Sequence, residues 1–260
     1  MRMFAIGLVW IPAVLWFDRT ATNTGQFVLG VLTWVLLIAL LRRESGAVRL
    51  QVGIVVAFAT LIEYVFSAGL EVYIYRLDHV PPYVPPGHGL VYLAALTLAR
   101  STVLRGHARI AVSATVAVAS SYAVWGLVFS PRPDALGAFW CLCLVGFLIW
   151  GSSRLLYVGA FIVVTYLELL GTAWGVWAWQ THDPTGIVTI GNPPSVAAGG
   201  YGWFDLAAVA LAPWLAAMWA RWRAGSLRPG LLRPESFRRR SGDAQPVHDL
   251  VVQMGVGGDG

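Results

Sequence analysis

Long apolar runs separated by short polar segments make up most of the chain. Because an α-helix needs about 20 mostly apolar residues to cross a bilayer, runs that approach this length predict transmembrane helices. Eight runs do so, near residues 3–17, 26–41, 50–75, 88–100, 108–129, 136–150, 155–180 and 203–222. The pattern therefore predicts an all-α, polytopic membrane helix bundle with about eight transmembrane helices.

The first apolar run has two interpretations. Arg2 followed by an apolar stretch is typical of a secretory signal peptide. However, Asp18 and Arg19 follow the run at once, and no clear A-x-A cleavage site is present. We therefore expect a retained first helix.

Composition agrees with a membrane protein. Apolar residues make up 57% of the 260 residues and charged residues only 12%, whereas soluble domains carry about 25% charged residues. Every basic residue is an arginine. The two cysteines, Cys141 and Cys143, lie two apart in an apolar run and suit neither a disulfide nor a metal pair.

The arginines lie unevenly about the predicted spans. With the N-terminus in the cytoplasm, fifteen of the eighteen arginines fall in cytoplasmic segments, and only Arg19, Arg76 and Arg132 fall in outer loops. This positive-inside bias predicts a cell-membrane protein with both termini in the cytoplasm. The cytoplasmic arginines also account for the basic pI of 9.6, so the pI does not indicate a nucleic-acid partner. Residues 223–260, rich in Arg, Gly and Pro, predict a disordered cytoplasmic tail.

The two halves of the chain share a pattern. Glu63 and Glu168 each follow the start of an apolar run by the same distance, and each is followed four residues later by a small hydroxyl side chain (Ser67, Thr172). A Pro-Pro loop and a similar apolar segment come next in both halves. We expect a parallel 4+4 repeat, with residues 1–105 as the first four-helix unit and residues 106–222 as the second.

The two glutamates are the strongest functional signal. A carboxyl group inside the bilayer costs roughly 2.5–3.5 kcal/mol on insertion scales, so it predicts a functional site. On a continuous helix, Glu63, Ser67, Glu71 and Tyr75 would recur every four residues along one face. We expect Glu63 and Glu168 to be the catalytic pair.

Other polar residues lie at the predicted outer ends of the same helices. Glu71 and Asp205 are expected to orient substrate or stabilise charge. Tyr92 and His88 are expected to line the entrance of the site. The remaining candidate substrate-binding residues are Ser67, Thr172 and Asn192.

The proline-rich segments leave two alternatives open. Val84-Pro85-Pro86-Gly87-His88-Gly89, and similarly 191–194, could be a tight turn that caps the next helix. Alternatively, either could be a re-entrant loop that shapes a substrate entrance, since irregular backbone at membrane depth is tolerated where it lines a cavity.

A metal site is a weaker alternative. His79, His88, His182 and Asp183 could supply ligands, but no tight ligand spacing such as HExxH is present. The sequence also lacks a P-loop, a dinucleotide fingerprint and a G-x-S-x-G motif, so it identifies no cofactor.

Aromatic residues surround both glutamates, which indicates either an interfacial aromatic belt or a pocket whose π-faces stabilise cationic centres. Acids beside π-faces could protonate an olefin or epoxide, and in this general respect the pattern resembles small membrane-embedded terpenoid cyclases. The leading hypothesis is therefore an enzyme that modifies a lipid or isoprenoid by acid–base chemistry. The alternatives are a proton-coupled transporter, and a scaffold or assembly subunit whose acids pair with a protein partner.

Overall fold

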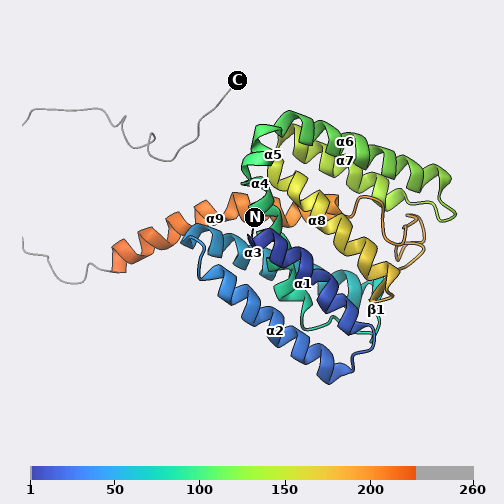
Figure 1. Cartoon of the computed structure of the whole chain (residues 1–260), viewed down its shortest axis with the longest axis horizontal. Coiled ribbons are helices and arrows are strands. Elements are labelled where there is room, and N and C mark those ends of the chain that lie inside the picture. Colours follow the sequence, from blue (N-terminus) through green and yellow to red (C-terminus); the bar gives the residue numbers. More distant parts are fainter. Residues whose placement is uncertain (1, 227–260) are drawn as a thin grey trace, which may run out of the picture. The chain divides into compact units, whose positions relative to one another are not determined.

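The computed structural model describes residues 2–226, which are mostly helical (Figure 1). Of the described residues, 2–220 form one compact unit, and the remainder is the end of the last helix. The helices are α1 (Arg2–Asp18), α2 (Asn23–Leu41), α3 (Gly46–Glu63), α4 (Val84–Ala99), α5 (Thr102–Gly106), α6 (Ala108–Val124), α7 (Ala135–Trp150), α8 (Arg154–Ala173) and α9 (Ala198–Ser226). Residues 227–260 of the predicted tail lie outside the described part of the chain.

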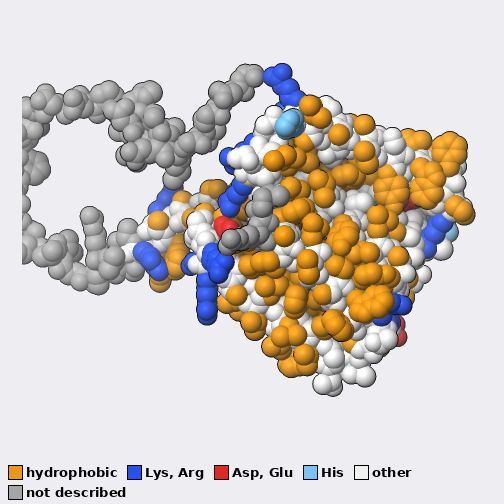
Figure 2. All heavy atoms as spheres, in the orientation of Figure 1, with side chains coloured by type: hydrophobic (Ala, Val, Ile, Leu, Met, Phe, Trp, Pro, Cys, Tyr) orange, Lys and Arg blue, Asp and Glu red, His pale blue; other side chains and the backbone are white. Residues whose placement is uncertain are grey.

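The helices have the length and surface of membrane helices. Within the described residues, five are long and apolar enough to cross a membrane, and the apolar helices α1, α4 and α7 are shorter. Large apolar side chains are exposed, with Leu142 at 73% and Trp150 at 82%. Figure 2 shows such side chains across the broad middle of the visible face. The prediction of a mostly helical chain with several helices able to span a membrane is confirmed, while the eight-span count stays a prediction.

Helices α4 and α8 pack against each other at the centre. Close approach is possible because small residues meet there: a Cβ atom at Gly159 would lie 2.5 Å from the carbonyl oxygen of Ala95. Helices α1, α2 and α3 pack around α4, and α6 and α7 pack against α8. Glu168 therefore lies on one helix of this central pair, and Glu63 lies at the end of α3, which packs against the other.

Two expected helices end earlier than the apolar pattern predicted. The helix expected over 50–75 changes at Glu63 to a π-helix, η1 (Tyr64–Gly69), and the helix expected over 155–180 ends at Ala173. Glu71 and Gly175 then adopt positive φ angles of 51° and 67°, which a continuing α-helix excludes. The expected single-helix stripe from Glu63 to Tyr75 was therefore wrong.

Two short strands replace the expected helix ends. Strand β1 (Tyr73–Tyr75) pairs antiparallel with β2 (Trp177–Trp179), so that Tyr73 lies opposite Trp179 and Tyr75 opposite Trp177. Flanking hydrogen bonds run from the Arg76 amide to Val176 and from Gln180 to Val72, both at 2.9 Å. The mostly helical fold therefore includes one short two-stranded ribbon, which joins the segments that follow α3 and α8.

The Pro85-Pro86 segment belongs to a helix start. Helix α4 begins at Val84, and prolines follow within its first turn, where the missing N–H groups have no intrahelical role. The segment is therefore neither a turn ahead of the helix nor a re-entrant loop, because it forms the first turns of α4 itself. The second proline pair precedes α9 in an irregular connection.

Two buried aspartates fix the loops beside the ribbon. Asp18, at the end of α1, accepts hydrogen bonds from Gln26 at 2.7 Å and from the Tyr83 hydroxyl at 3.0 Å. Asp134 caps α7 at the Gly137 amide and also accepts from the amide of Gly191 at 2.9 Å. Asp18 thus connects the end of α1 to the segment that precedes α4. Asp134 connects the start of α7 to the segment that precedes α9.

Candidate functional site

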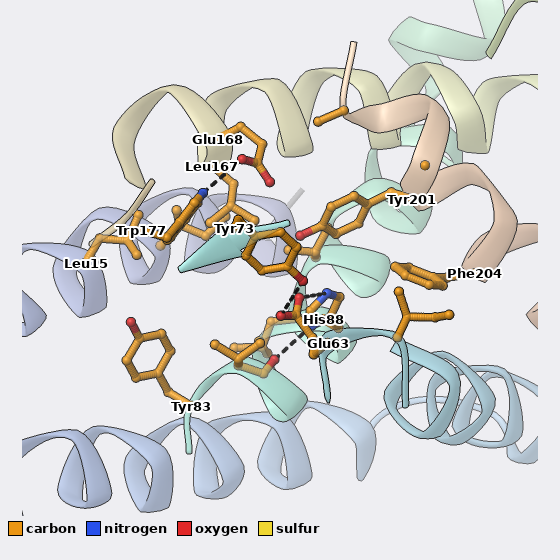
Figure 3. A pocket seen from close by; sticks show the side chains of 18 of the residues that line it. Leu15, Glu63, Tyr73, Tyr83, His88, Leu167, Glu168, Trp177, Tyr201 and Phe204 are labelled. Carbon is orange, nitrogen blue, oxygen red and sulfur yellow. Dashed lines mark hydrogen bonds and ion pairs between the residues drawn. The ribbon is translucent and has the colours of Figure 1, made fainter. Parts of the chain in front are cut away.

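A cavity of about 400 Å³ lies beneath the ribbon. Its walls come from α1, α3, α4, α8 and α9, and aromatic and aliphatic side chains form most of them. Glu63 and Glu168 line the cavity and are only 6% and 5% exposed. Figure 3 shows both carboxyl groups turned toward the space that also holds Tyr73 and Tyr201.

Glu63 is held by two tyrosines and one histidine. Its Oε2 atom accepts hydrogen bonds from the hydroxyls of Tyr73 at 2.7 Å and Tyr75 at 2.8 Å. Its Oε1 atom lies 3.3 Å from Nε2 of His88. These polar contacts of the carboxyl group therefore come from β1 and the first turns of α4.

The contacts of His88 define how it shares a proton with Glu63. The Nδ1 atom of His88 lies 3.0 Å from the carbonyl oxygen of Val84. A carbonyl only accepts, so Nδ1 carries a hydrogen and a neutral imidazole has its lone pair on Nε2. The 3.3 Å contact between Nε2 and Oε1 is an ion pair when His88 is cationic and Glu63 is ionised, so the pair then carries one proton more than a neutral imidazole beside a carboxylate. The pair can hold this proton in the cavity wall.

Glu168 is held by two tryptophans. Its Oε2 atom accepts hydrogen bonds from the indole N–H of Trp177 at 3.0 Å and of Trp179 at 3.1 Å. The Oε1 atom has no hydrogen-bond partner among the described residues. Because both lone pairs of Oε2 are engaged, a proton bound by this carboxyl group would sit on Oε1.

The four aromatic donors form one structure, which we name the aromatic clamp: Tyr73, Tyr75, Trp177 and Trp179. All four point from the ribbon toward the cavity side and are at least 90% buried. The rings of Tyr73 and Trp179 lie 4.5 Å apart, and those of Tyr75 and Trp177 lie 6.1 Å apart. One packed unit therefore supplies hydrogen bonds to both carboxyl groups.

The tyrosines of the clamp are hydrogen-bond donors over a wide pH range. Burial, together with the nearby Glu63 charge, raises the pKa of Tyr73 and of Tyr75 well above the ordinary value. The hydroxyl groups therefore keep their hydrogens at neutral and moderately alkaline pH. Both can donate to an ionised Glu63.

Residues behind the clamp fix its position. The side chain of Trp177 lies directly against Gly171, where a Cβ atom would collide with the indole. The Oδ1 atom of Asn192 accepts the backbone N–H of Trp179 at 3.0 Å, and Trp140 contacts the Trp179 ring edge-on at 5.7 Å. Asn192 therefore supports the clamp through its backbone and does not line the cavity.

An aromatic wall faces the Glu63 side of the cavity. The ring of Tyr201 stacks on His88 with centroids 5.3 Å apart, and Phe204 contacts His88 edge-on at 5.7 Å. These rings enclose the Glu63–His88 pair, and His88 is only 5% exposed. His88 is thus part of the cavity wall rather than of an exposed entrance.

Three other predicted site residues lie away from the cavity lining. Glu71 is exposed, in the turn between η1 and β1. Ser67 is buried within η1, and the hydroxyl of Thr172 donates to the carbonyl oxygen of Glu168 at 2.7 Å. The structure does not bring these side chains to the two carboxyl groups.

Asp205 and Tyr92 lie in a different part of the molecule. Asp205 is 5% exposed, and its Oδ2 atom is buried without a hydrogen-bond partner among the described residues. Tyr92 is 1% exposed, and its hydroxyl likewise lacks a partner there. Neither residue lines the 400 Å³ cavity. The expected grouping of Asp205 with the two glutamates is therefore not found.

The alternative metal ligands do not come together. His79 contacts the carbonyl oxygen of Leu77, and His182 contacts the hydroxyl of Thr181. The carboxylate of Asp183 accepts the backbone N–H of Val188 in its own loop. No group of three His, Cys, Asp or Glu side chains suited to a metal ion occurs within residues 2–226.

Sequence reasoning missed the hydrogen-bonding role of the clamp. The sequence contains an aromatic-x-aromatic pair that begins nine or ten residues after each buried glutamate, and this spacing is the signal that could have identified the donors. Aromatic composition alone indicates only an interfacial belt or a π-lined pocket. The supporting aspartates, Asp18 and Asp134, were also missed.

No protein-family model, curated protein or solved structure matches this chain. The cavity and the residues that line it are therefore the features from which a function can be inferred.

Proposed function

We propose that the chain is a multi-pass enzyme of the cell membrane that modifies an apolar lipid or isoprenoid by acid–base chemistry in the 400 Å³ cavity. The observation that carries the proposal is that two buried carboxyl groups, each held by two aromatic donors, line one apolar and aromatic cavity. Buried carboxyl groups are costly, so a geometry that holds two of them favours a chemical role.

The Glu63–His88 pair is the proposed proton donor. Its shared proton is transferred to one carbon of a substrate double bond, and the other carbon becomes a carbocation. Glu63 is left as a carboxylate, which the hydroxyls of Tyr73 and Tyr75 stabilise by hydrogen bonds at 2.7 and 2.8 Å. These donors are already in position before the transfer, which lowers the cost of forming the charge.

Glu168 is the proposed proton acceptor. As a carboxylate it faces the cation, and the π-faces of the clamp add a further stabilising contribution. Its free Oε1 atom then removes a proton from a neighbouring carbon, and a double bond forms again. One proton enters and one leaves, so the net reaction is an isomerisation or cyclisation that needs no co-reactant. Between turnovers Glu168 releases its proton to water and the Glu63–His88 pair takes one up from water, so each turnover draws its proton from the solvent.

Deuterium incorporation tests this proposal for any lipid substrate of this class. The protein is placed in nanodiscs made from the lipids of its producing cell and incubated in D₂O, and the lipids are examined by mass spectrometry after exchangeable positions are returned to hydrogen. We expect deuterium on carbon in an apolar lipid with the wild type. Glu63→Gln and Glu168→Gln should each reduce incorporation by about 100-fold or more, the usual contribution of a general acid or base.

Glu71→Gln is the matched control, because Glu71 is an exposed carboxyl group outside the cavity lining. This variant should incorporate deuterium like the wild type. Full incorporation by both cavity variants, or none by the wild type, would overturn the proposal.

A proton-coupled transporter is the second candidate. It is favoured by a further cavity of about 640 Å³ near the other end of α4, since a transporter needs access from both sides. Uptake into proteoliposomes driven by a pH gradient would support transport. Product formation without a gradient would support the enzyme.

A further inference from the structure

The 640 Å³ cavity and the 400 Å³ cavity lie along different parts of α4. The two glutamates line only the 400 Å³ cavity. Val91 lines the first cavity, and Tyr92, Leu96 and Arg100 line the second. From Val84 to Arg100 the helix rises about 24 Å, so the second cavity opens at the end that carries the α4–α5 and α7–α8 turns. We name this the arginine-rich end.

Three arginines line this cavity, Arg100, Arg105 and Arg154, and its lining among the described residues contains no acidic side chain. Arg100 contacts Glu44 at 3.3 Å, and Arg154 donates to the carbonyl oxygen of Ile149 at 2.8 Å. Arg105 has no hydrogen bond or ion pair with another described side chain. Glu44 balances the charge of Arg100, and the other two arginines of the lining have no ion pair with an acidic side chain of the described residues.

Neutral donors complete the lining. Ser152 and Ser153 belong to it, at the N-terminus of the 20-residue helix α8. The side chain of Ser153 makes no capping hydrogen bond, and the Leu156 amide donates to the carbonyl oxygen of Ser153 at 2.9 Å. The amides of Arg154 and Leu155 therefore remain as donors for another acceptor.

Tyr92 gives an independent indication of a ligand. It is 1% exposed and lines the cavity, and its hydroxyl has no hydrogen-bond partner among the described residues. A buried hydroxyl without a partner is costly, and a bound acceptor would remove that cost.

We propose that this cavity binds a phosphate group, carried either by an anionic phospholipid headgroup or by a soluble phosphate compound. Guanidinium groups match phosphate oxygens with paired hydrogen bonds, and two uncompensated charges suit a phosphate of charge −1 to −2. The site is separate from the acid–base cavity and does not depend on the function proposed for it.

Binding is measured on the full chain purified in detergent, by native mass spectrometry with phosphatidylglycerol or phosphatidylcholine, and by calorimetric titration with inorganic pyrophosphate. We expect phosphatidylglycerol, pyrophosphate or both to bind. Arg105→Gln and Arg154→Gln should each weaken binding about tenfold, as expected for the loss of a charge-assisted hydrogen bond. Tyr92→Phe should weaken binding several-fold while leaving the net charge unchanged.

Arg43→Gln is the matched control, because Arg43 is exposed near the same end but lies outside the lining. It should bind like the wild type, and melting temperatures check that every variant is folded. Binding of phosphatidylglycerol without pyrophosphate identifies a lipid headgroup, and the reverse identifies a soluble phosphate. The proposal is overturned if neither probe binds, or if Arg105→Gln and Arg154→Gln bind as tightly as Arg43→Gln.

Discussion

Each buried glutamate is held by side chains that come from a strand, not from its own helix. Glu63 accepts from Tyr73 and Tyr75, and Glu168 accepts from Trp177 and Trp179. In each case both donors bind Oε2. The Oε1 atom of Glu63 contacts His88, and the Oε1 atom of Glu168 is left to face the cavity. At the scale of single residues, this orientation of the carboxyl groups favours acid–base chemistry.

Gly171→Ala should disrupt the Glu168 side of the clamp. The added methyl group would occupy the position of the Trp177 indole, and overpacking of this kind costs about 1–3 kcal/mol. We expect a lower melting temperature in detergent and a change in tryptophan emission.

Gly53→Ala is the control for this change, since a Cβ atom there meets nothing within 4 Å. It should be neutral or stabilising by up to about 1 kcal/mol. A melting temperature for Gly171→Ala equal to that of Gly53→Ala would contradict the packing described.

The clamp tyrosines should resist alkaline titration. Their pKa values are raised well above the ordinary value, so they stay neutral in the folded protein when exposed tyrosines ionise. Their stabilising contribution is present below about pH 10, the ordinary tyrosine pKa, and is lost at higher pH because the unfolded chain then releases protons more readily.

Absorbance of tyrosinate measures this difference. At about pH 11, one unit above the ordinary pKa, Tyr73 and Tyr75 should still be un-ionised in the folded wild type. The double variant Tyr73→Phe/Tyr75→Phe should therefore give the same tyrosinate signal as the folded wild type. A signal smaller by two tyrosines would show that the clamp hydroxyls ionise normally.

At the scale of elements, the ribbon joins two segments that are far apart in sequence. Glu63 precedes the first residue of β1 by ten positions, whereas Glu168 precedes the first residue of β2 by nine. The π-helix η1 accommodates the additional residue, because a π turn contains more residues than an α turn. The matched clamps are what a duplicated unit would produce, and the duplication itself stays a prediction.

A disulfide can test the ribbon register. Ile74 lies opposite Ala178, and residues directly opposite each other in an antiparallel pair are within the range of a disulfide. In a background without Cys141 and Cys143, Ile74→Cys combined with Ala178→Cys should cross-link on mild oxidation.

Ile74→Cys combined with Ile187→Cys is the control, because Ile187 is 81% exposed in the loop after β2 and outside the ribbon. It should cross-link much less. Equal cross-linking of the two pairs would argue against the ribbon.

The apolar pattern predicted most helices because burial and membrane exposure both favour long apolar runs. It did not predict the ribbon, since Tyr73-Ile74-Tyr75 and Trp177-Ala178-Trp179 are as apolar as the helices that precede them. The strands form through pairing with each other, which is a tertiary effect outside any local window. The burial of Glu63 and Glu168 could be anticipated from their apolar neighbours, but the separation of Asp205 from them could not.

At the scale of the whole molecule, an apolar outer surface lies between two ends of different composition. The turns after α2, α4 and α7 carry many arginines, and the other end carries the ribbon and its loops. The positive-inside rule predicts that the arginine-rich end faces the cytoplasm.

Cysteine accessibility measures this orientation. In a background without native cysteines, a membrane-impermeant thiol reagent applied to intact cells should label Thr185→Cys, an exposed position in the loop after β2. It should not label Ser152→Cys, an exposed position in the α7–α8 turn, until the cells are opened. The opposite labelling pattern would contradict the predicted topology.

We propose that Glu63 and Glu168 serve one cavity that holds an apolar molecule. A cryo-electron microscopy map of the full chain, purified with its native lipids, would show whether such a molecule is bound. We predict elongated non-protein density in the cavity that reaches the Oε1 atom of Glu168 and the Glu63–His88 pair. A map in which either carboxyl group turns out toward the surrounding acyl chains, or in which the cavity holds only water, would contradict the account.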